Sequence, residues 1–255
     1  MRPERIATIL LTGALLAGCG TLPSGPQGTP ASKAADAARI HVQLGQRYLE
    51  QGKLDVALEK LQKAIQYDPG YVDAHTVIAV LYDRIGDTEK AEKHYRRATE
   101  LTPKAGAVNN NYGGFLCRHG RYEQAEKHFQ RAIADPFYKT PDVALANAGT
   151  CQIQAGHPDA AEAALRRALE INSNNGDALF QLAAILHRKQ DDFHARAFIQ
   201  RFEGLGQVTA DALLLGRQIE LALGNTSAAE DYARRLRQQF PDSEQVRTLD
   251  SSNPP

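Results

Sequence analysis

The sequence lacks an excess of either charge, with 30 lysines and arginines against 30 aspartates and glutamates. Nucleic-acid binding depends on basic groups that neutralise phosphates and release counterions, so we expect no nucleic-acid partner. The three cysteines form no Cys-x-x-Cys pair, and the chain has no His-x-x-Glu-His motif and no Gly-rich phosphate loop. It also lacks a Gly-x-Ser-x-Gly nucleophile elbow and the local signatures of catalytic cysteines. We therefore expect no metal, no cofactor, no small-molecule substrate and no enzymatic activity.

The N-terminal apolar run is too short to span a membrane. It covers Ile6 to Ala17, 12 residues without a charge, whereas a membrane-spanning helix needs about 20. Arg2 and Arg5 precede this run, as in an export signal. The run ends in Leu-Ala-Gly-Cys at residues 16–19, which resembles the lipobox of bacterial lipoproteins. The alternative is an ordinary signal peptide with a chance cysteine.

The lipobox resemblance implies cleavage after residue 18 and lipidation of Cys19. The cysteine would carry a lipid on its sulfur and usually a further acyl chain, such as palmitate, on its amine. Several acyl chains together give stable anchoring without a membrane span. Gly20 follows where an inner-membrane lipoprotein commonly has Asp, so the resemblance implies the periplasmic face of the outer membrane.

Composition divides the mature chain into three parts. Residues 19–36 are dense in Gly, Pro, Ser and Thr after the cysteine, which predicts a flexible tether. Residues 37–243 carry the apolar pattern of a folded domain. Residues 244–255 are polar and end in Asn-Pro-Pro, which predicts a disordered tail.

The folded part contains an internal repeat of 34 residues. The sequence AEKHYRRA at 91–98 recurs as AEKHFQRA at 125–132. This period with small residues at fixed positions resembles the tetratricopeptide repeat (TPR), a pair of antiparallel helices. The resemblance implies an all-α, right-handed superhelical solenoid whose groove is lined mainly by first helices. We place six repeats at 38–71, 72–105, 106–139, 142–175, 176–209 and 210–243, with a two-residue insertion around Thr140 and Pro141.

The repeat register assigns structural roles to most of the conspicuous residues. Gly52 and its equivalents in later repeats would end first helices, where positive φ costs glycine least. Repeat five has Gln190 at this position and is the least regular repeat. Four histidines also occupy equivalent slots in successive repeats, which indicates duplication or packing rather than a metal site; they are His41 with His75, and His94 with His128.

The whole arrangement resembles the PilF/PilW family of type IV pilus biogenesis lipoproteins. The resemblance rests on the lipobox, the short tether, six repeats, and cysteines in repeats three and four. It implies a pilotin-like protein that assists outer-membrane localisation and multimer assembly of the pilus secretin subunit. The alternative of the same broad class is an outer-membrane scaffold for cell-wall synthases or hydrolases.

Cys117 and Cys151 are the predicted disulfide. Both lie on first helices of adjacent repeats, and export would place them in an oxidising compartment. Two free buried thiols are the alternative, because a disulfide needs Cα atoms within about 7 Å.

The repeat register also predicts a partner-binding groove on the concave side of the first two repeats. Its apolar members are Val42, Leu49 and Val80. They are flanked by polar residues, namely Arg39, Gln46, Glu50, Asp83 and Arg84. An apolar strip with a polar rim is typical of a protein-binding surface, and the family resemblance implies that a secretin segment occupies it. The alternative is that the apolar residues close the N-terminal end of the superhelix.

Asn110 and Asn111 occupy first-helix slots that some TPR domains use to grip a C-terminal carboxylate. That clamp needs a further Asn one turn later, where this sequence has Gly114. We therefore predict no carboxylate capture.

Overall fold

The computed structural model describes residues 29–251. Within this range the chain forms thirteen α-helices and no strand. The helices are α1 Pro30–Glu50, α2 Leu54–Tyr67, α3 Val72–Arg84, α4 Thr88–Leu101, α5 Gly106–Arg118, α6 Tyr122–Ala134, α7 Pro141–Gln154, α8 Pro158–Ile171, α9 Gly176–Arg188, α10 Asp192–Gly204, α11 Ala210–Ala222, α12 Thr226–Gln239 and α13 Glu244–Ser251.

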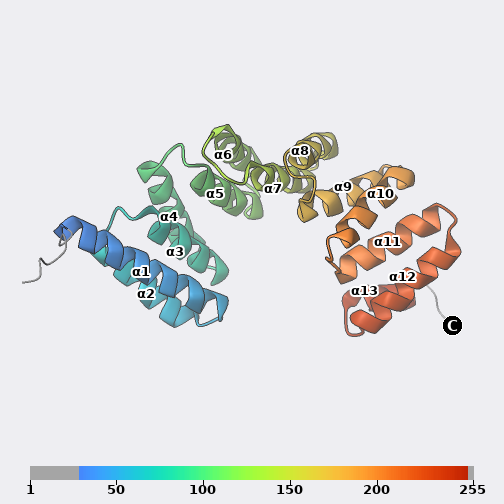
Figure 1. Cartoon of the computed structure of the whole chain (residues 1–255), viewed down its shortest axis with the longest axis horizontal. Helices are drawn as coiled ribbons and strands as arrows, with labels where there is room; N and C mark the ends of the chain where they lie inside the picture. Colours follow the sequence, from blue (N-terminus) through green and yellow to red (C-terminus); the bar gives the residue numbers. More distant parts are fainter. Residues whose placement is uncertain (1–28, 252–255) are drawn as a thin grey trace, which may run out of the picture.

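Successive helices form antiparallel pairs that stack into a curved solenoid (Figure 1). Each first helix contacts its own second helix and the first helix of the next pair, as α5 contacts α6 and α7. Six pairs, from α1–α2 to α11–α12, correspond to the six predicted repeats, so the all-α TPR solenoid is confirmed. No helix in the described part of the chain is long and apolar enough to cross a membrane.

Small residues allow the two helices of a pair to approach closely. Ala57 and Ala64 of α2 are fully buried. A Cβ atom built on Gly45 of α1 would lie 2.6 Å from Cγ of Leu61. A larger residue at position 45 would therefore collide with Leu61, so the first pair needs a glycine at this contact, while repeats two and five have alanine at the equivalent positions.

The turn inside each pair ends the first helix with a residue in the left-handed backbone region. Five of these turns use glycine, with φ of 73° at Gly52, 81° at Gly86, 71° at Gly120, 82° at Gly156 and 77° at Gly224. In the α9–α10 turn, Gln190 takes the same conformation with a φ of 63°. Repeat five, the least regular repeat in sequence, therefore keeps the turn geometry of the other pairs, and a residue with a Cβ carries the strain there.

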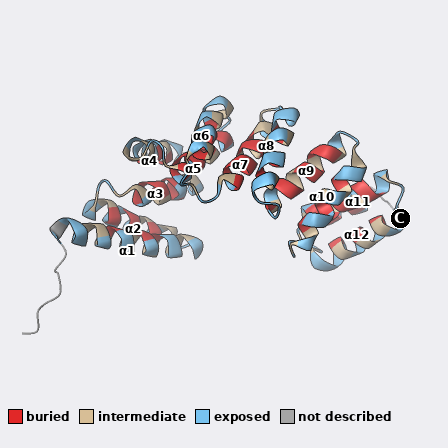
Figure 2. Cartoon of the chain, turned by 45° about the horizontal axis from the view of Figure 1, so that its top comes forward, coloured by how far each residue is buried: buried red, intermediate tan, exposed pale blue. Residues whose placement is uncertain are grey.

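The core is a layer of buried side chains between the helices of each pair and between neighbouring pairs, while the outward faces are exposed (Figure 2). Its largest fully buried members include Tyr95, Phe115 and Phe129, which lie in repeats two and three. One cluster runs from Ala38 to Cys151, so the first three pairs and α7 share a core. Each pair therefore depends on its neighbours to cover its apolar faces.

The predicted tether is wrong at its C-terminal end, because α1 begins at Pro30 instead of near residue 37. Thr29 accepts a hydrogen bond from the backbone N–H of Ser32 at 3.2 Å and so caps the helix. Pro30 sits in the first turn, where its missing N–H costs nothing. The alanine-rich residues that follow favour helix, so composition alone misled the prediction.

The predicted tail is also wrong over most of its length, because α13 covers residues 244–251. Val246 and Leu249 are 9% and 2% exposed and pack with Leu213 and Leu236. The Ser243 hydroxyl accepts a hydrogen bond from the Val246 N–H at 3.2 Å. These two apolar residues, three apart in a polar segment, cover the otherwise open end of the last repeat.

Candidate partner-binding groove

A hollow of about 300 Å³ lies where α3, α5 and α7 stand side by side. Its floor comes from the paired second helices, through Tyr95 and Phe129. The other lining residues come from first helices, and they are Val80, Asn110, Asn111, Gly114, Cys117, Arg118, Asn147, Thr150 and Gln154. The hollow is therefore centred on repeats two to four, one repeat further along the chain than the predicted groove.

Amide side chains give the hollow its chemistry. Asn147 Nδ2 donates to Asn110 Oδ1 at 3.0 Å, which links α7 to α5. Asn110 is only 7% exposed, so this contact satisfies a largely buried amide. An amide offers both donors and acceptors, and the neighbouring Asn111 and Gln154 are exposed. The wall of the hollow can therefore hydrogen-bond to the N–H and C=O groups of an extended peptide.

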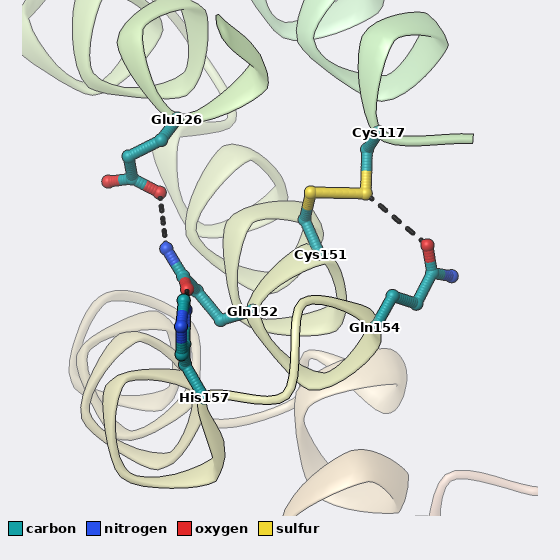
Figure 3. The surroundings of a disulfide bond; sticks show 6 residues. All are labelled: Cys117, Glu126, Cys151, Gln152, Gln154 and His157. Atoms are coloured by element: carbon teal, nitrogen blue, oxygen red, sulfur yellow. Dashed lines mark hydrogen bonds between the residues drawn. A yellow bond between two sulfur atoms is a disulfide. The ribbon is translucent and has the colours of Figure 1, made fainter. Parts of the chain in front are cut away.

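A disulfide joins the same two helices next to this hollow. Cys117 of α5 and Cys151 of α7 have Cα atoms 5.7 Å apart, and both side chains are buried (Figure 3). Gln154 places its Oε1 3.4 Å from the Cys117 sulfur. Because of the two-residue insertion before α7, Cys151 lies two positions earlier in its repeat than Cys117 does. The covalent link fixes how far α5 and α7 can separate, and hence the width of the hollow.

A chain of polar contacts supports α7 on the side of the second helices. Gln152 Nε2 donates to Glu126 Oε2 at 3.0 Å, and Gln152 Oε1 lies 2.9 Å from His157 Nδ1 (Figure 3). His157 is the N-terminal residue flanking α8. One glutamine thus connects repeat three to both helices of repeat four.

The rim of the hollow carries a compact charged cluster around Asp83 of α3. Its carboxylate accepts hydrogen bonds from Arg118 at 2.6 Å and from His119 at 2.9 Å, both at the end of α5. Burial acts to raise the pKa of Asp83, but the hydrogen bonds from His119 and Arg118 outweigh it and hold the pKa below its ordinary value. Asp83 therefore stays ionised and ties α3 to α5.

The structure divides the predicted groove residues into two groups. Val42 is only 4% exposed and belongs to the core cluster shared by α1, α2 and α3, so its assignment to the groove is wrong. Its position is covered because α1 packs on α3 as well as on α2. Leu49 is half-buried, and its carbonyl accepts a hydrogen bond from Arg84 at 3.1 Å. Val80 is 37% exposed and lines the hollow.

The polar residues predicted on α1 lie outside the hollow. Arg39 forms an exposed ion pair with Asp36 at 3.1 Å. Gln46 and Glu50 are exposed. None of the three lines the hollow of repeats two to four. Cys19, the predicted lipidation site, lies outside the described residues.

The histidines at equivalent slots pack against one another or against the backbone. His75 Nδ1 lies 3.0 Å from His94 Nδ1, and His75 Nε2 lies 3.0 Å from the Pro69 carbonyl oxygen. One repeat later, Asn109 replaces the first histidine, and His128 Nδ1 lies 2.9 Å from its Oδ1. This arrangement confirms a packing role. No group of three or more potential metal ligands occurs among residues 29–251.

Sequence reasoning missed Asn147, Thr150 and Gln154 as part of the site. Once the insertion is placed, the register aligns them with Asn111, Gly114 and Arg118 of repeat three, but the predicted groove was confined to the first two repeats. Asn110 and Asn111 carry a signal for this wall, because two adjacent amides on a first helix can hydrogen-bond to a peptide backbone as well as to a C-terminal carboxylate. Placing α7 by its contact with α5 identifies the shared amide wall.

Comparisons with known proteins agree with this architecture. The tetratricopeptide repeat family models match residues 48–110, 143–175 and 212–243. Stacked helix pairs of this kind, with a hollow between first helices, define a TPR protein, a class that binds other proteins.

Relatives identify the particular family. The chain is 31% identical over 241 residues to the type IV pilus assembly protein PilF of Pseudomonas aeruginosa. This alignment covers 94% of this chain and 95% of that protein. The crystal structure of PilW, a widely conserved type IV pilus biogenesis factor, superposes with a TM-score of 0.76 at 33% identity, covering 83% of this chain and 97% of PilW. The structure of Pseudomonas aeruginosa PilF superposes with a TM-score of 0.77 at 28% identity, covering 88% and 100%. This chain therefore belongs to the PilF/PilW family of type IV pilus biogenesis TPR proteins.

Proposed function

We propose that this protein is a lipid-anchored outer-membrane scaffold that binds the pilus secretin subunit and assists its localisation and multimer assembly. The observation that carries the binding site is the hollow of repeats two to four, where Val80 stands beside an amide wall. Membership of the PilF/PilW family supports a role in type IV pilus biogenesis. The lipobox at residues 16–19 supports the anchor on Cys19.

The hollow suits an extended segment of another protein. Val80 offers an apolar contact, and Asn111 and Gln154 offer hydrogen bonds to a peptide backbone. The disulfide and the Asp83–Arg118 ion pair hold the walls in place, which lowers the entropy cost of binding. These features support a binding scaffold.

The groove is tested by Val80→Glu in the full chain. Val80 is exposed enough to accept a charge without unfolding, so thermal stability and helicity should change little. We expect secretin multimers and twitching motility to be lost, because the charge enters the apolar part of the hollow. The matched control is Ile171→Glu, which changes a 54% exposed residue on a second helix and should preserve both. Normal multimers in Val80→Glu would place the binding site elsewhere.

Two further experiments separate the other parts of the proposal. Deleting the gene should abolish secretin multimers and twitching motility. Altered cell shape with normal pili would instead indicate the cell-wall scaffold.

Cys19→Ser should leave the repeats folded while releasing the protein from the outer membrane, and unchanged outer-membrane fractionation would reject the anchor.

A further inference from the structure

The connection between α6 and α7 presents a strongly exposed aromatic ring. Phe137 is 84% exposed, the highest value among the large hydrophobic residues of the described chain. Its backbone is nevertheless held firmly, because its N–H donates to Asp135 Oδ1 at 3.0 Å. The other oxygen of Asp135 accepts from the Gly106 N–H at 2.7 Å. The loop is thus fixed to the start of α5, and the ring points away from the protein.

The surface beside Phe137 is apolar with a basic rim. A shallow hollow there is lined by Phe137, Asp135 and the neighbouring α4–α5 turn, residues 102–105, which includes Pro103. Lys104 lines the hollow, and Lys139 follows Phe137 by two residues in the same loop; both lysines are exposed. In the described part of the chain, neither lysine has a carboxylate partner. An aromatic ring between free lysines suits the boundary between lipid headgroups and acyl chains.

This patch lies on the edge of the solenoid where the chain enters the fold. Each second helix runs antiparallel to its first helix, so every turn from a second helix to a first helix lies at the N-terminal end of a first helix, as the start of α1 does. The α2–α3 turn confirms this placement, since Tyr71 lies within electrostatic range of Asp36 and Arg39 of α1. The α6–α7 loop belongs to the same edge.

We propose that this edge faces the bilayer, with Phe137 inserted at the interface and Lys104 and Lys139 against anionic phospholipid headgroups. The inference rests on the proposed lipid anchor at Cys19. Nine residues lie between Cys19 and Thr29, and ten residue-to-residue steps span at most about 35 Å. The anchor therefore keeps this edge within reach of the membrane, and Phe137 with its two lysines fixes which part of it makes contact.

The chain contains no tryptophan, so a single introduced tryptophan reports its own environment. The probe is Phe137→Trp in the full lipidated protein, reconstituted into vesicles of phosphatidylethanolamine and phosphatidylglycerol with brominated acyl chains. The matched control is Phe193→Trp. Phe193 is 64% exposed at the start of α10, next to the α9–α10 turn on the opposite edge.

We expect the tryptophan at position 137 to lose roughly half of its emission to the brominated lipid, with a shift to shorter wavelength, as for a ring inserted into the interface. The tryptophan at position 193 should stay unquenched. Adding Lys104→Glu and Lys139→Glu should reduce the quenching at position 137, because the new carboxylates repel the anionic lipid.

Equal and weak quenching at both positions, in protein that still floats with the vesicles, would overturn the membrane-facing edge and leave the anchor standing. A shift at position 137 that requires added envelope protein instead of lipid would also overturn it. Protein that fails to float at all would reject the anchor itself.

Discussion

At the residue scale, the α9–α10 turn shows the cost of a side chain in a glycine conformation. Gln190 has a φ of 63°, while the equivalent residues of the other five pairs are glycines. The left-handed conformation costs an L-residue about 1–2 kcal/mol. Glycine avoids this cost, but it loses more conformational entropy on folding, so the net gain in stability is smaller.

We therefore expect Gln190→Gly to raise the free energy of unfolding by about 1 kcal/mol, measured by thermal or denaturant unfolding. The opposite change, Gly224→Ala, should lower it by a similar amount. A Gln190→Gly protein that is no more stable than the parent would show that the turn is not strained.

Val42 illustrates how burial changes the meaning of an apolar position. Because it is 4% exposed in a shared core, Val42→Glu should cost about 3 kcal/mol or more by burying a charge without a partner. Gln46→Glu, one turn later at an exposed position, should be nearly neutral in the same unfolding measurement. Equal stability of the two variants would show that the side chain of Val42 is not buried in the core.

At the element scale, the disulfide is a clamp between α5 and α7. It joins residues separated by 34 positions in sequence, so closing this loop in the unfolded chain contributes about 3–4 kcal/mol in the chain-entropy model. Replacing both cysteines by alanine should lower the free energy of unfolding by that order. Reductant should destabilise the parent and leave the double variant unchanged. Two free thiols by mass spectrometry, in protein isolated without reductant, would refute the bridge.

The helix α13 acts as the C-terminal cap of the solenoid. Leu249 is 2% exposed against the last repeat, so Leu249→Ala should cost about 2–4 kcal/mol. Arg247→Ala, which changes an exposed neighbour, should have little effect on the same melting curve. If both variants melt like the parent, residues 244–251 contribute nothing to the fold.

At the scale of the whole molecule, stability depends unevenly on pH along the solenoid. Burial lowers the pKa of both His94 and His128 to about 4, helped by His75 in the first case and Arg131 in the second. Their ordinary pKa is about 6.5, so the unfolded chain binds protons below that pH while the folded chain does not. The stability that the two neutral histidines contribute to the folded state is fully present above about pH 6.5 and is lost as the pH falls towards 4.

A stack of repeats can loosen locally, and both histidines lie in repeats two and three. We expect hydrogen exchange at pH 5, corrected for intrinsic rates, to rise in α3–α6 more than in α9–α12. His94→Gln with His128→Gln should flatten this difference. A uniform increase along all six pairs would show that acid acts on the fold as a whole.

The sequence by itself determined the repeat fold and its register. The 34-residue period, the small residues between paired helices and the turn glycines act over one or two helices, so local pattern was sufficient to place the pairs. The same register identified Cys117 and Cys151 as neighbours. Helix starts at Pro30 and Glu244 were also encoded locally, in caps and apolar spacing, but average composition obscured them.

Only the tertiary structure decided which apolar and polar residues form the groove. Periodicity shows which face of a helix is apolar, but the packing of one pair on the next decides whether that face is covered. Thus α1 buries Val42 against its neighbours while Val80 remains open. The amide wall of Asn110 and Asn147 likewise exists because α5 and α7, which belong to separate repeats, pack against each other.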